Sequence, residues 1–369
     1  MRWVVNNKEE DSRRPWLPSS FSPQFKMISL KERINSFESW YKSHPYALIA
    51  VVVVAVAIVV FLVTPGSQGT SISEEELARR DSAALHIALM PVDDCIPFYY
   101  AQRTGIYDRL GLDLRIKTLQ SQLDTDTALA RGHVELAYSD LARAIMLQQD
   151  TVELRAIAAT DAPLQLITAR RGRVRQLSQL RERMVAVARH SITDFWSDRL
   201  TDTTRLARAD IFRPQINDVR IRTDMLCNGT MDAAFLPEPY AGEAIRRGNK
   251  LNFTTEGLEP QLFAYLATES ALTDDTRSQQ LQLLFQGYTE AVNQLQLSQY
   301  QDTLAVLYKE LCFTPDSLLD SLALHARFMP LRAPRRSDAE AALEWLRSRD
   351  KVKAGYTIDS LIHTFPIPQ

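Results

Sequence analysis

The stretch LHIALMPVDDCIPFYYAQRTGIYDRLGLDLRIKTL, residues 85–119, contains the pattern that decides the fold. Its first segment, 85–90, is a short apolar run that predicts a buried strand. Residues 96–104 carry apolar side chains at helical spacing, and Gly105 supplies the left-handed residue with which helices commonly end. Residues 112–119 alternate between apolar and polar, which predicts a second strand. A strand, a helix and a strand in this order are typical of α/β folds with parallel strands.

The same rhythm continues toward the C-terminus. Further strands are predicted at 134–138, 154–159, 164–169, 184–188, 218–223, 233–236 and 262–268. Further helices are predicted at 123–131, 141–149, 191–200, 224–227 and 240–247. From 274 to 326, and again from 339 to 347, the pattern is helical with few glycines. The sequence thus predicts an α/β fold with mainly parallel sheets and a helical C-terminal part.

One segment is echoed later in the chain. LARGHVELA at 129–137 and LCNGTMDAA at 226–234 place Leu, Gly, an acidic residue and Ala at the same offsets. Any helix–Gly–strand unit produces such a pattern, and the alternative is two lobes of similar design. Ligands of open α/β sheets bind at the carboxyl ends of the strands, so two facing sheets would form one cleft between them.

A long apolar segment precedes the folded part. Residues 47–63, ALIAVVVVAVAIVVFLV, contain no polar side chain. As a helix they span roughly 25 Å, and Thr64 extends them toward the ~30 Å thickness of a hydrocarbon core. Basic residues precede the segment at Lys26, Lys31, Arg33 and Lys42, and none follows until Arg79. The excess of positive charge marks the cytoplasmic side, so the chain after the segment is predicted to lie outside.

We therefore predict a single-pass anchor of the cytoplasmic membrane at 47–64. Residues 1–46 form a cytoplasmic, partly disordered N-terminus, residues 65–83 form a linker, and the lobes lie in the periplasm or outside. A cleaved signal peptide is the alternative, but its apolar region would be shorter, and no A-x-A cleavage site follows Val63.

Composition and cysteine spacing exclude several classes of function. The 43 Lys and Arg are balanced by 45 Asp and Glu, so the net charge of -2 argues against nucleic-acid binding. The three cysteines, Cys95, Cys227 and Cys312, lie far apart without metal-ligand spacing. We predict no metal site, no cofactor and no nucleic-acid partner. A phosphate-binding G-x-x-x-x-G-K-[ST] motif is also missing, so an ATPase would be a separate chain.

Four stretches together resemble a known family. The opening stretch at 87–116, with its GIY and GLDL elements, resembles the start of the ABC-importer binding proteins that include the aliphatic sulfonate, nitrate/taurine and thiamine-precursor binders. TALARGHVELAYSD at 127–140, LRERMVAVARHSITDF at 180–195 and LCNGTMDAAFLPEPYAGEAIRRG at 226–248 resemble later elements of that family, in the right order. A retained anchor departs from that family, which usually has a cleaved signal or a lipid.

The resemblance implies a two-lobed periplasmic-binding-protein-like fold. One lobe would comprise 84–170 with 258–369 and the C-terminal helices, and the other 171–257, with chain crossings near 170–175 and 254–257. Ligand binding would close the lobes by a hinge motion. The closed form would dock on an ABC permease, with permease and ATPase supplied as separate chains.

Polar residues at predicted strand ends form the candidate ligand site. Asp93 and Asp94 follow the first strand, and Tyr99 comes from the helix after it; the two carboxylates could instead cap that helix. The remaining candidates follow later strands or begin later helices: Ser139, Asp140, Thr160, Asp161, His190, Ser191, Glu238 and Tyr240. Asp140 and Ser191 are also natural helix caps. In the family, the element around Glu238 borders the site.

The leading functional hypothesis is delivery of a small solute to an importer, without catalysis. Asp93, Asp94, Asp161 and Glu238 make the cleft acidic, which favours a neutral or cationic, nitrogen-bearing solute. Two alternatives remain, a tethered sensor or scaffold and an enzyme of the same fold. Synthases of this fold would need a cysteine-rich iron motif and a cofactor lysine, and neither is visible.

Overall fold

The computed structural model describes residues 53, 74–172 and 174–368, and its folded unit begins at Glu74. Apart from Val53, the predicted anchor at 47–64 lies outside the described residues, as do the N-terminus and part of the linker. Within the described part, no helix combines the length and the apolar character needed to cross a membrane.

The first sheet, sheet A, has the strand order β2-β1-β3-β9-β4. Its strands are β1 (Leu85–Leu89), β2 (Leu114–Thr118), β3 (Leu136–Asp140), β4 (Leu154–Ala159) and β9 (Phe263–Thr268). β1 pairs in parallel with β2 and β3, whereas β9 runs antiparallel between β3 and β4. The strand between β3 and β4 therefore comes from a part of the chain more than a hundred residues after both of them.

The second sheet, sheet B, has the order β6-β7-β5-β8. Its strands are β5 (Gln165–Thr168), β6 (Val185–Ala186), β7 (Ala233–Leu236) and β8 (Lys250–Thr254). β6 and β7 are parallel, and β5 is antiparallel to both β7 and β8. Both sheets are therefore mixed, but in each of them one strand runs against all the others. The prediction of mainly parallel sheets is confirmed for the remaining strands and fails at β5 and β9. Strands β5 and β9 each follow a chain crossing. They run against their neighbours because the chain enters each sheet at the end where the neighbouring strands finish.

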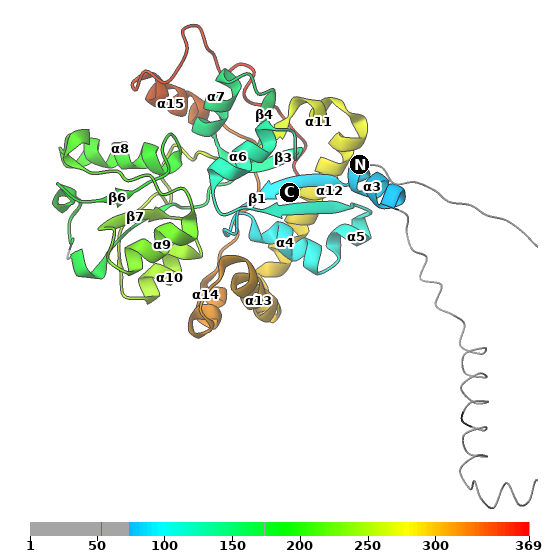
Figure 1. The fold of residues 1–369 in the computed structure, drawn as a ribbon, viewed down its shortest axis with the longest axis horizontal. Coiled ribbons are helices and arrows are strands. Elements are labelled where there is room, and N and C mark those ends of the chain that lie inside the picture. The colour runs from blue at the N-terminus through cyan, green and yellow to red at the C-terminus, as the bar shows by residue number, and fades with distance from the viewer. Residues whose placement is uncertain (1–52, 54–73, 173, 369) are drawn as a thin grey trace, which may run out of the picture. The chain divides into compact units, whose positions relative to one another are not determined.

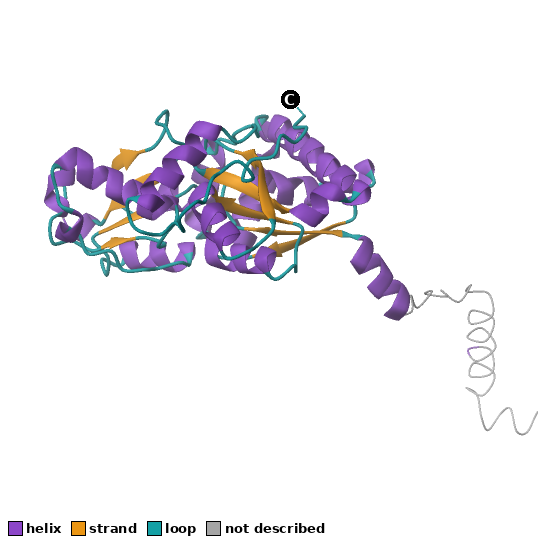
Figure 2. Cartoon of the chain, turned by 90° about the horizontal axis from the view of Figure 1, so that it is seen from above, coloured by secondary structure: helices purple, strands orange, loops and turns teal. Residues whose placement is uncertain are grey.

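Helices cover both groups of strands (Figures 1 and 2). They are α3 (Glu74–Ala83), α4 (Ile96–Arg103), α5 (Ile106–Leu110), α6 (Gln122–Ala130), α7 (Leu141–Gln149), α8 (Ile192–Thr204), α9 (Val219–Cys227), α10 (Tyr240–Arg246), α11 (Glu269–Thr273), α12 (Asp275–Leu295), α13 (Gln301–Cys312), α14 (Leu319–His325) and α15 (Arg336–Arg347). We call sheet A with α4 to α7 and α11 to α15 the first lobe, and sheet B with α8 to α10 the second lobe.

The chain crosses between the lobes at residues 160–164 and returns at 255–262. The first crossing thus precedes the predicted one at 170–175, and β5 belongs to the second lobe although the sequence assigned 84–170 to the first. The apolar pattern of β5 shows that it is buried, but pairing with β7 and β8, which decides its sheet, is a long-range property.

The predicted strand at 218–223 is wrong, because these residues begin helix α9. The Val-Arg-Ile-Arg alternation resembled a strand. However, Asp218 accepts a hydrogen bond from the Ile221 amide and caps a helix that buries Val219 and Leu226, seven residues apart. Ile221, which a strand would have buried, is 52% exposed. The helical spacing of the buried side chains therefore prevails over the alternation.

Aromatic side chains fill the core of the first lobe. The centroid of the Tyr265 ring, on strand β9, lies 5.4 Å from the ring centroids of both Phe98 and Tyr138. Phe98 also packs on Tyr288 of α12 at 4.7 Å. The Tyr265 hydroxyl donates to the Asp94 carbonyl at 2.7 Å, so the core directly supports the loop after β1.

Gly287 lies where α12 packs on α5. A Cβ at this position would overlap the Tyr107 ring, whose hydroxyl donates to the Leu284 carbonyl at 3.2 Å. We expect Gly287→Ala to lower the free energy of unfolding by about 2 kcal/mol through overpacking, although alanine favours helices. Urea unfolding measures this, with Gln286→Ala on the exposed face of α12 as control. Equal stabilities of the two variants would contradict the packing argument.

Candidate functional site

A cavity of about 270 Å³ lies between the two lobes. Its lining combines the loop after β1, the two chain crossings, the start of β5, the end of β7 and the segment after α14. The lining residues are Val92, Asp93, Asp94, Ala162, Pro163, Gln165, Pro237, Glu238, Glu256, His325, Arg327 and Met329. Because β1, β4, β7 and β8 all point their carboxyl ends at this region, the cavity has the position expected for a ligand site in paired α/β sheets.

Asp93 is buried at the junction of the lobes. Its Oδ1 accepts a hydrogen bond from the Tyr308 hydroxyl at 2.8 Å, and its backbone amide donates to the Glu238 carbonyl at 2.9 Å. Burial, and then the neighbouring Glu238 carboxylate, raise the pKa of Asp93 well above its usual value. The residue therefore links the first lobe, through Tyr308, to the end of β7 in the second.

The Asp94 side chain accepts two hydrogen bonds, whereas the Asp93 side chain accepts one. Asp94 Oδ2 accepts hydrogen bonds from the Tyr138 hydroxyl at 2.7 Å and from Thr160 Oγ1 at 2.9 Å. Burial raises the pKa of Asp94 to about 6, against the lowering effect of these two bonds. Neither Asp93 nor Asp94 caps α4, since no side chain caps that helix. The alternative interpretation of these carboxylates as caps is thus wrong.

Glu238 faces the cavity from the second lobe. Its Oε1 accepts from Gln165 Nε2 at 2.7 Å and its Oε2 from the Gly242 amide at 2.8 Å, so both oxygens have donors within the lobe. By contrast, Oδ2 of Asp93 and Oδ1 of Asp94 have no hydrogen-bond donor among the described residues. These two oxygens are available for hydrogen bonds with a ligand.

The other predicted site residues lie outside the cavity lining. The Tyr99 hydroxyl donates to Thr118 in the core, and the Ser139 hydroxyl donates to Asp126. Thr160 reaches the cavity only through its bond to Asp94. Asp161 is half-exposed and pairs with Arg332 at 2.6 Å and Arg335 at 3.3 Å.

Three of the remaining candidates lie on the second lobe. Ser191 caps α8, its Oγ accepting from the Thr193 amide at 3.2 Å. His190 has a left-handed backbone, with φ of 58°, and its buried Nδ1 has no hydrogen-bond partner among the residues that the structure describes. Tyr240 is fully buried in its lobe under the guanidinium of Arg220. The structure thus brings Asp93, Asp94 and Glu238 to one cavity and leaves these three away from its lining.

Asp140 joins the lobes instead of lining the cavity. Its Oδ1 caps α7 by accepting from the Arg143 amide at 2.9 Å. Its Oδ2 accepts from Gln122 Nε2 at 3.1 Å and from the Ile192 amide, at the first residue of α8 in the second lobe, at 2.9 Å. Burial raises the pKa of Asp140 to about 6. One carboxylate therefore occupies the N-terminus of α8, where backbone N–H groups and the helix dipole favour an anion.

Several lining residues had no signal in the sequence. His325 and Arg327 come from the helical C-terminal part, where no strand end marks a cleft. Gln165 belongs to a strand that the sequence placed in the other lobe. Glu256, on the return crossing, lies 3.9 Å from Arg327 as a loose ion pair. Within the described ranges, no three His, Cys, Asp or Glu side chains form a group that could hold a metal ion.

Comparison with known proteins gives matches of family and fold. Residues 93–261 match the family model described as NMT1/THI5 like. No curated protein sequence matches the chain. Among solved structures, the periplasmic aliphatic sulphonate binding protein SsuA from Escherichia coli aligns with a TM-score of 0.64 at 16% identity, over 78% of this chain and 94% of that one.

Two further structures align over similar spans. The periplasmic nitrate-binding protein NrtA from Synechocystis PCC 6803 gives a TM-score of 0.62 at 12% identity, over 74% of this chain and 83% of that one. The zinc-bound ligand binding component of an ABC-type import system from Staphylococcus aureus gives a TM-score of 0.62 at 11% identity, over 76% of this chain and 96% of that one. The resemblance predicted from the sequence is therefore confirmed: residues 93–261 match the NMT1/THI5-like family model, and the chain has the two-lobed α/β fold seen in periplasmic solute-binding proteins.

Proposed function

We propose that the chain is an extracytoplasmic binding protein, anchored in the cytoplasmic membrane by residues 47–64, that delivers a small solute to an ABC importer. The permease and the ATPase would be separate chains, and this chain would perform no catalysis. The observation that carries the proposal is the cavity between the lobes, where Asp93 and Asp94 each present a carboxyl oxygen that receives no donor from the described residues. The shared fold of two periplasmic solute-binding proteins and of a ligand binding component of an ABC-type import system supports it.

The charges around the cavity favour a nitrogen-bearing solute. Asp94, with a pKa of about 6, is mostly ionised at neutral pH and has one oxygen to offer. Glu256 and Arg327 compensate each other at the margin. A protonated amine, or a neutral group rich in N–H donors, satisfies the acceptors of Asp93 and Asp94, whereas a sulfonate or nitrate would add an anion beside two carboxyl groups.

The placement of the lining on both lobes is suited to closure around a ligand. The two chain crossings, 160–164 and 255–262, both border the cavity and are the natural hinge segments. A solute bonded to Asp94 on the first lobe and packed against Pro237 on the second would favour the closed arrangement over an open one, because it contacts both lobes only when they meet.

The test is native mass spectrometry of the full chain, purified in mild detergent, followed by a thermal-shift screen of small metabolites. We expect a bound or stabilising nitrogen-bearing solute. Asp94→Asn should then weaken its binding about tenfold through loss of a charge-assisted hydrogen bond, whereas Asp108→Asn, an exposed carboxylate on α5, should leave it unchanged. Tight binding of a sulfonate or nitrate, or the absence of any ligand in both experiments, would contradict the proposal.

A further inference from the structure

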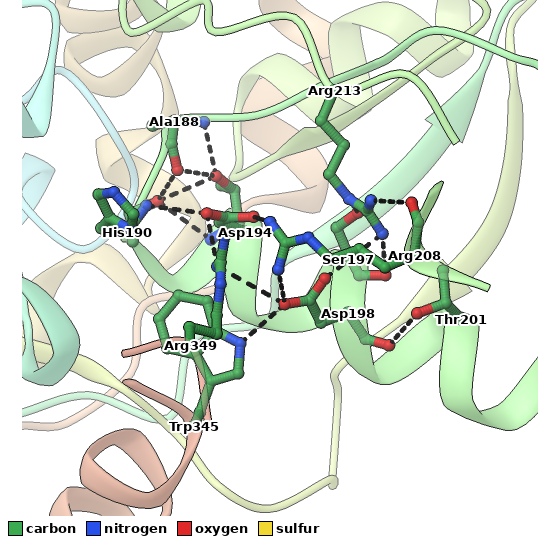
Figure 3. Close-up of polar contacts among 12 residues, drawn as sticks. Ala188, His190, Asp194, Ser197, Asp198, Thr201, Arg208, Arg213, Trp345 and Arg349 are labelled. Atoms are coloured by element: carbon green, nitrogen blue, oxygen red, sulfur yellow. Dashed lines mark hydrogen bonds and ion pairs between the residues drawn. The ribbon is translucent and has the colours of Figure 1, made fainter. Parts of the chain in front are cut away.

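A second cavity, of about 540 Å³, has a lining that shares no residue with the solute cavity. It is lined by Arg189, Asp194, Arg208, Ala209, Ile211, Arg213 and Arg349. Figure 3 shows Arg208, Arg213 and Arg349 gathered around Asp194 and Asp198 of helix α8. The unusual feature is four guanidinium groups around one hollow.

The carboxylates of α8 fix the guanidinium groups without using all of their donors. Arg208 Nη1 donates to Asp198 Oδ2 at 2.7 Å, and Arg349 Nη1 donates to Asp194 Oδ2 at 2.9 Å. Nε of Arg208, and both Nε and Nη2 of Arg349, have no hydrogen-bond acceptor in the described part of the chain. The guanidinium of Arg349 also lies 4.8 Å from the centre of the Trp345 ring, which holds its plane. Arg208 and Arg349 are therefore held in place, and each keeps N–H groups that are available to a ligand.

Arg189 adds a cation with no partner of its own. Its side chain is exposed at the edge of the cavity and makes no hydrogen bond or ion pair with any described residue. Arg213, by contrast, lies deeper, and its Nε donates to Ser197 Oγ at 2.7 Å. Burial is the main cause of the lowered pKa of Arg213, and the positive charges of Arg208 and Arg349 lower it further. The carboxylates of Asp198 and Asp194 act in the opposite direction.

The charge of the cluster is not balanced. Four arginines face the two carboxylates of Asp194 and Asp198, which leaves two positive charges uncompensated at the cavity. The surrounding lobe is also basic: residues 165–254 contain 16 Lys and Arg against 10 Asp and Glu, in a chain whose net charge is -2. Such a field concentrates anions at this lobe.

The cluster spans the two lobes. Arg189, Arg208 and Arg213 belong to the second lobe, whereas Arg349 follows α15, which packs on α7 of the first. Lys353, a few residues later, donates its backbone amide to Gln149 at the end of α7 at 2.6 Å. An anion held by Arg349 and by Arg208 together would therefore contact both lobes at once.

We propose that this cavity is a binding site for a doubly charged phosphate group, held by Arg189, Arg208 and Arg349. Guanidinium groups bind phosphate oxygens through paired N–H donors, and a dianion neutralises the two uncompensated charges. The bound group adds a connection between the lobes that is independent of the solute cavity. The site does not rest on the solute-delivery proposal, because no residue is common to the two cavities.

The decisive experiment is calorimetric titration of the full chain in detergent with inorganic phosphate, against sodium chloride of matched ionic strength. We expect saturable phosphate binding, weakened about tenfold in Arg189→Gln, which removes one charged donor. Arg199→Gln is the matched control, because Arg199 lies exposed on α8 over the Phe195 ring, outside the cavity. The control should bind phosphate as the native chain does.

Thermal unfolding supplies a second readout. Phosphate should raise the unfolding midpoint of the native chain and of Arg199→Gln, and the rise should shrink in Arg189→Gln. Because Arg189 makes no contact that the fold needs, this variant should fold normally. Vesicles containing phosphatidic acid distinguish a lipid phosphate from a free one: Arg189-dependent vesicle binding without phosphate binding assigns the group to a lipid. No binding of either, or equal losses in both variants, would overturn the site.

Discussion

Lowering the pH from 7.5 to 5 is expected to raise the free energy of unfolding by about 3 kcal/mol, because the folded protein takes up protons on Asp94 and Asp140 that the unfolded chain does not. Both carboxyl groups are buried, and burial raises the pKa of each to about 6. In the unfolded chain an aspartate has a pKa of about 3.9. Protonation in this window relieves the cost of burying a charge.

The sign follows from which state binds more protons. Between about pH 4 and pH 6 the folded state holds protons on these two residues while the unfolded state has released them, so stability falls as pH rises through 6. Burial also raises the pKa of Asp93 and Asp126, in the same direction. Burial lowers the pKa of His190, which opposes the trend.

Urea unfolding followed by tryptophan fluorescence at pH 7.5 and pH 5 measures the effect. The double variant Asp94→Asn/Asp140→Asn should be less dependent on pH over this range, because neither amide titrates. Asp108→Asn, at an exposed position, should keep the full dependence. A native chain that is equally stable or less stable at pH 5 would show that the two carboxyl groups titrate normally.

Replacing Asp140 with alanine is expected to lower the free energy of unfolding by about 4 kcal/mol and to loosen the contact between the lobes, since three donors lose their acceptor. These donors are the Arg143 amide, Gln122 Nε2 and the Ile192 amide. The side chain is fully buried, so water cannot readily replace it. Because Ile192 belongs to the second lobe, the loss affects both the cap of α7 and the junction.

The matched control is Asp274→Ala. Asp274 also caps a helix, accepting from the Arg277 amide at 2.8 Å, but it is exposed and makes no bond between lobes. Asp274→Ala should lower the free energy of unfolding by about 1 kcal/mol. Small-angle scattering should show a larger radius of gyration for Asp140→Ala only. If the two variants were equally stable and equally compact, Asp140 would act as a cap alone.

Local patterns in the sequence predicted most elements of the fold. The predicted bounds of α7, β4 and β7 coincide with the structure, because their apolar periodicity directly reflects which face is buried. β8 had no such signal. It is an edge strand that pairs only with β5, and its side chains are exposed or half-buried. Strand direction and sheet membership depend on distant residues, which explains why β5 was placed in the wrong lobe.

The sequence could predict only those residues of the candidate site that directly follow a strand. Asp93, Asp94 and Glu238 follow strands β1 and β7, so the topology of the sheets brings them together. His325 and Arg327 line the cavity from the end of α14 and the segment after it, and no local pattern in the sequence marks them. Asp140 shows a subtler limit: the sequence indicates a helix cap, but not that the same carboxylate also receives the first amide of α8. The ligand-binding role of the predicted residues stays a prediction.

The position of β9 between β3 and β4 in sheet A sets an order for assembly during synthesis. Sheet B is complete once the ribosome has made Thr254, the last residue of β8. Sheet A lacks the strand between β3 and β4 until Thr268 has been added, so the edges of those two strands stay unpaired while the whole second lobe is made. A chain that emerges N-terminus first therefore finishes its second lobe before its first, and the unfinished lobe is the part that needs protection from aggregation.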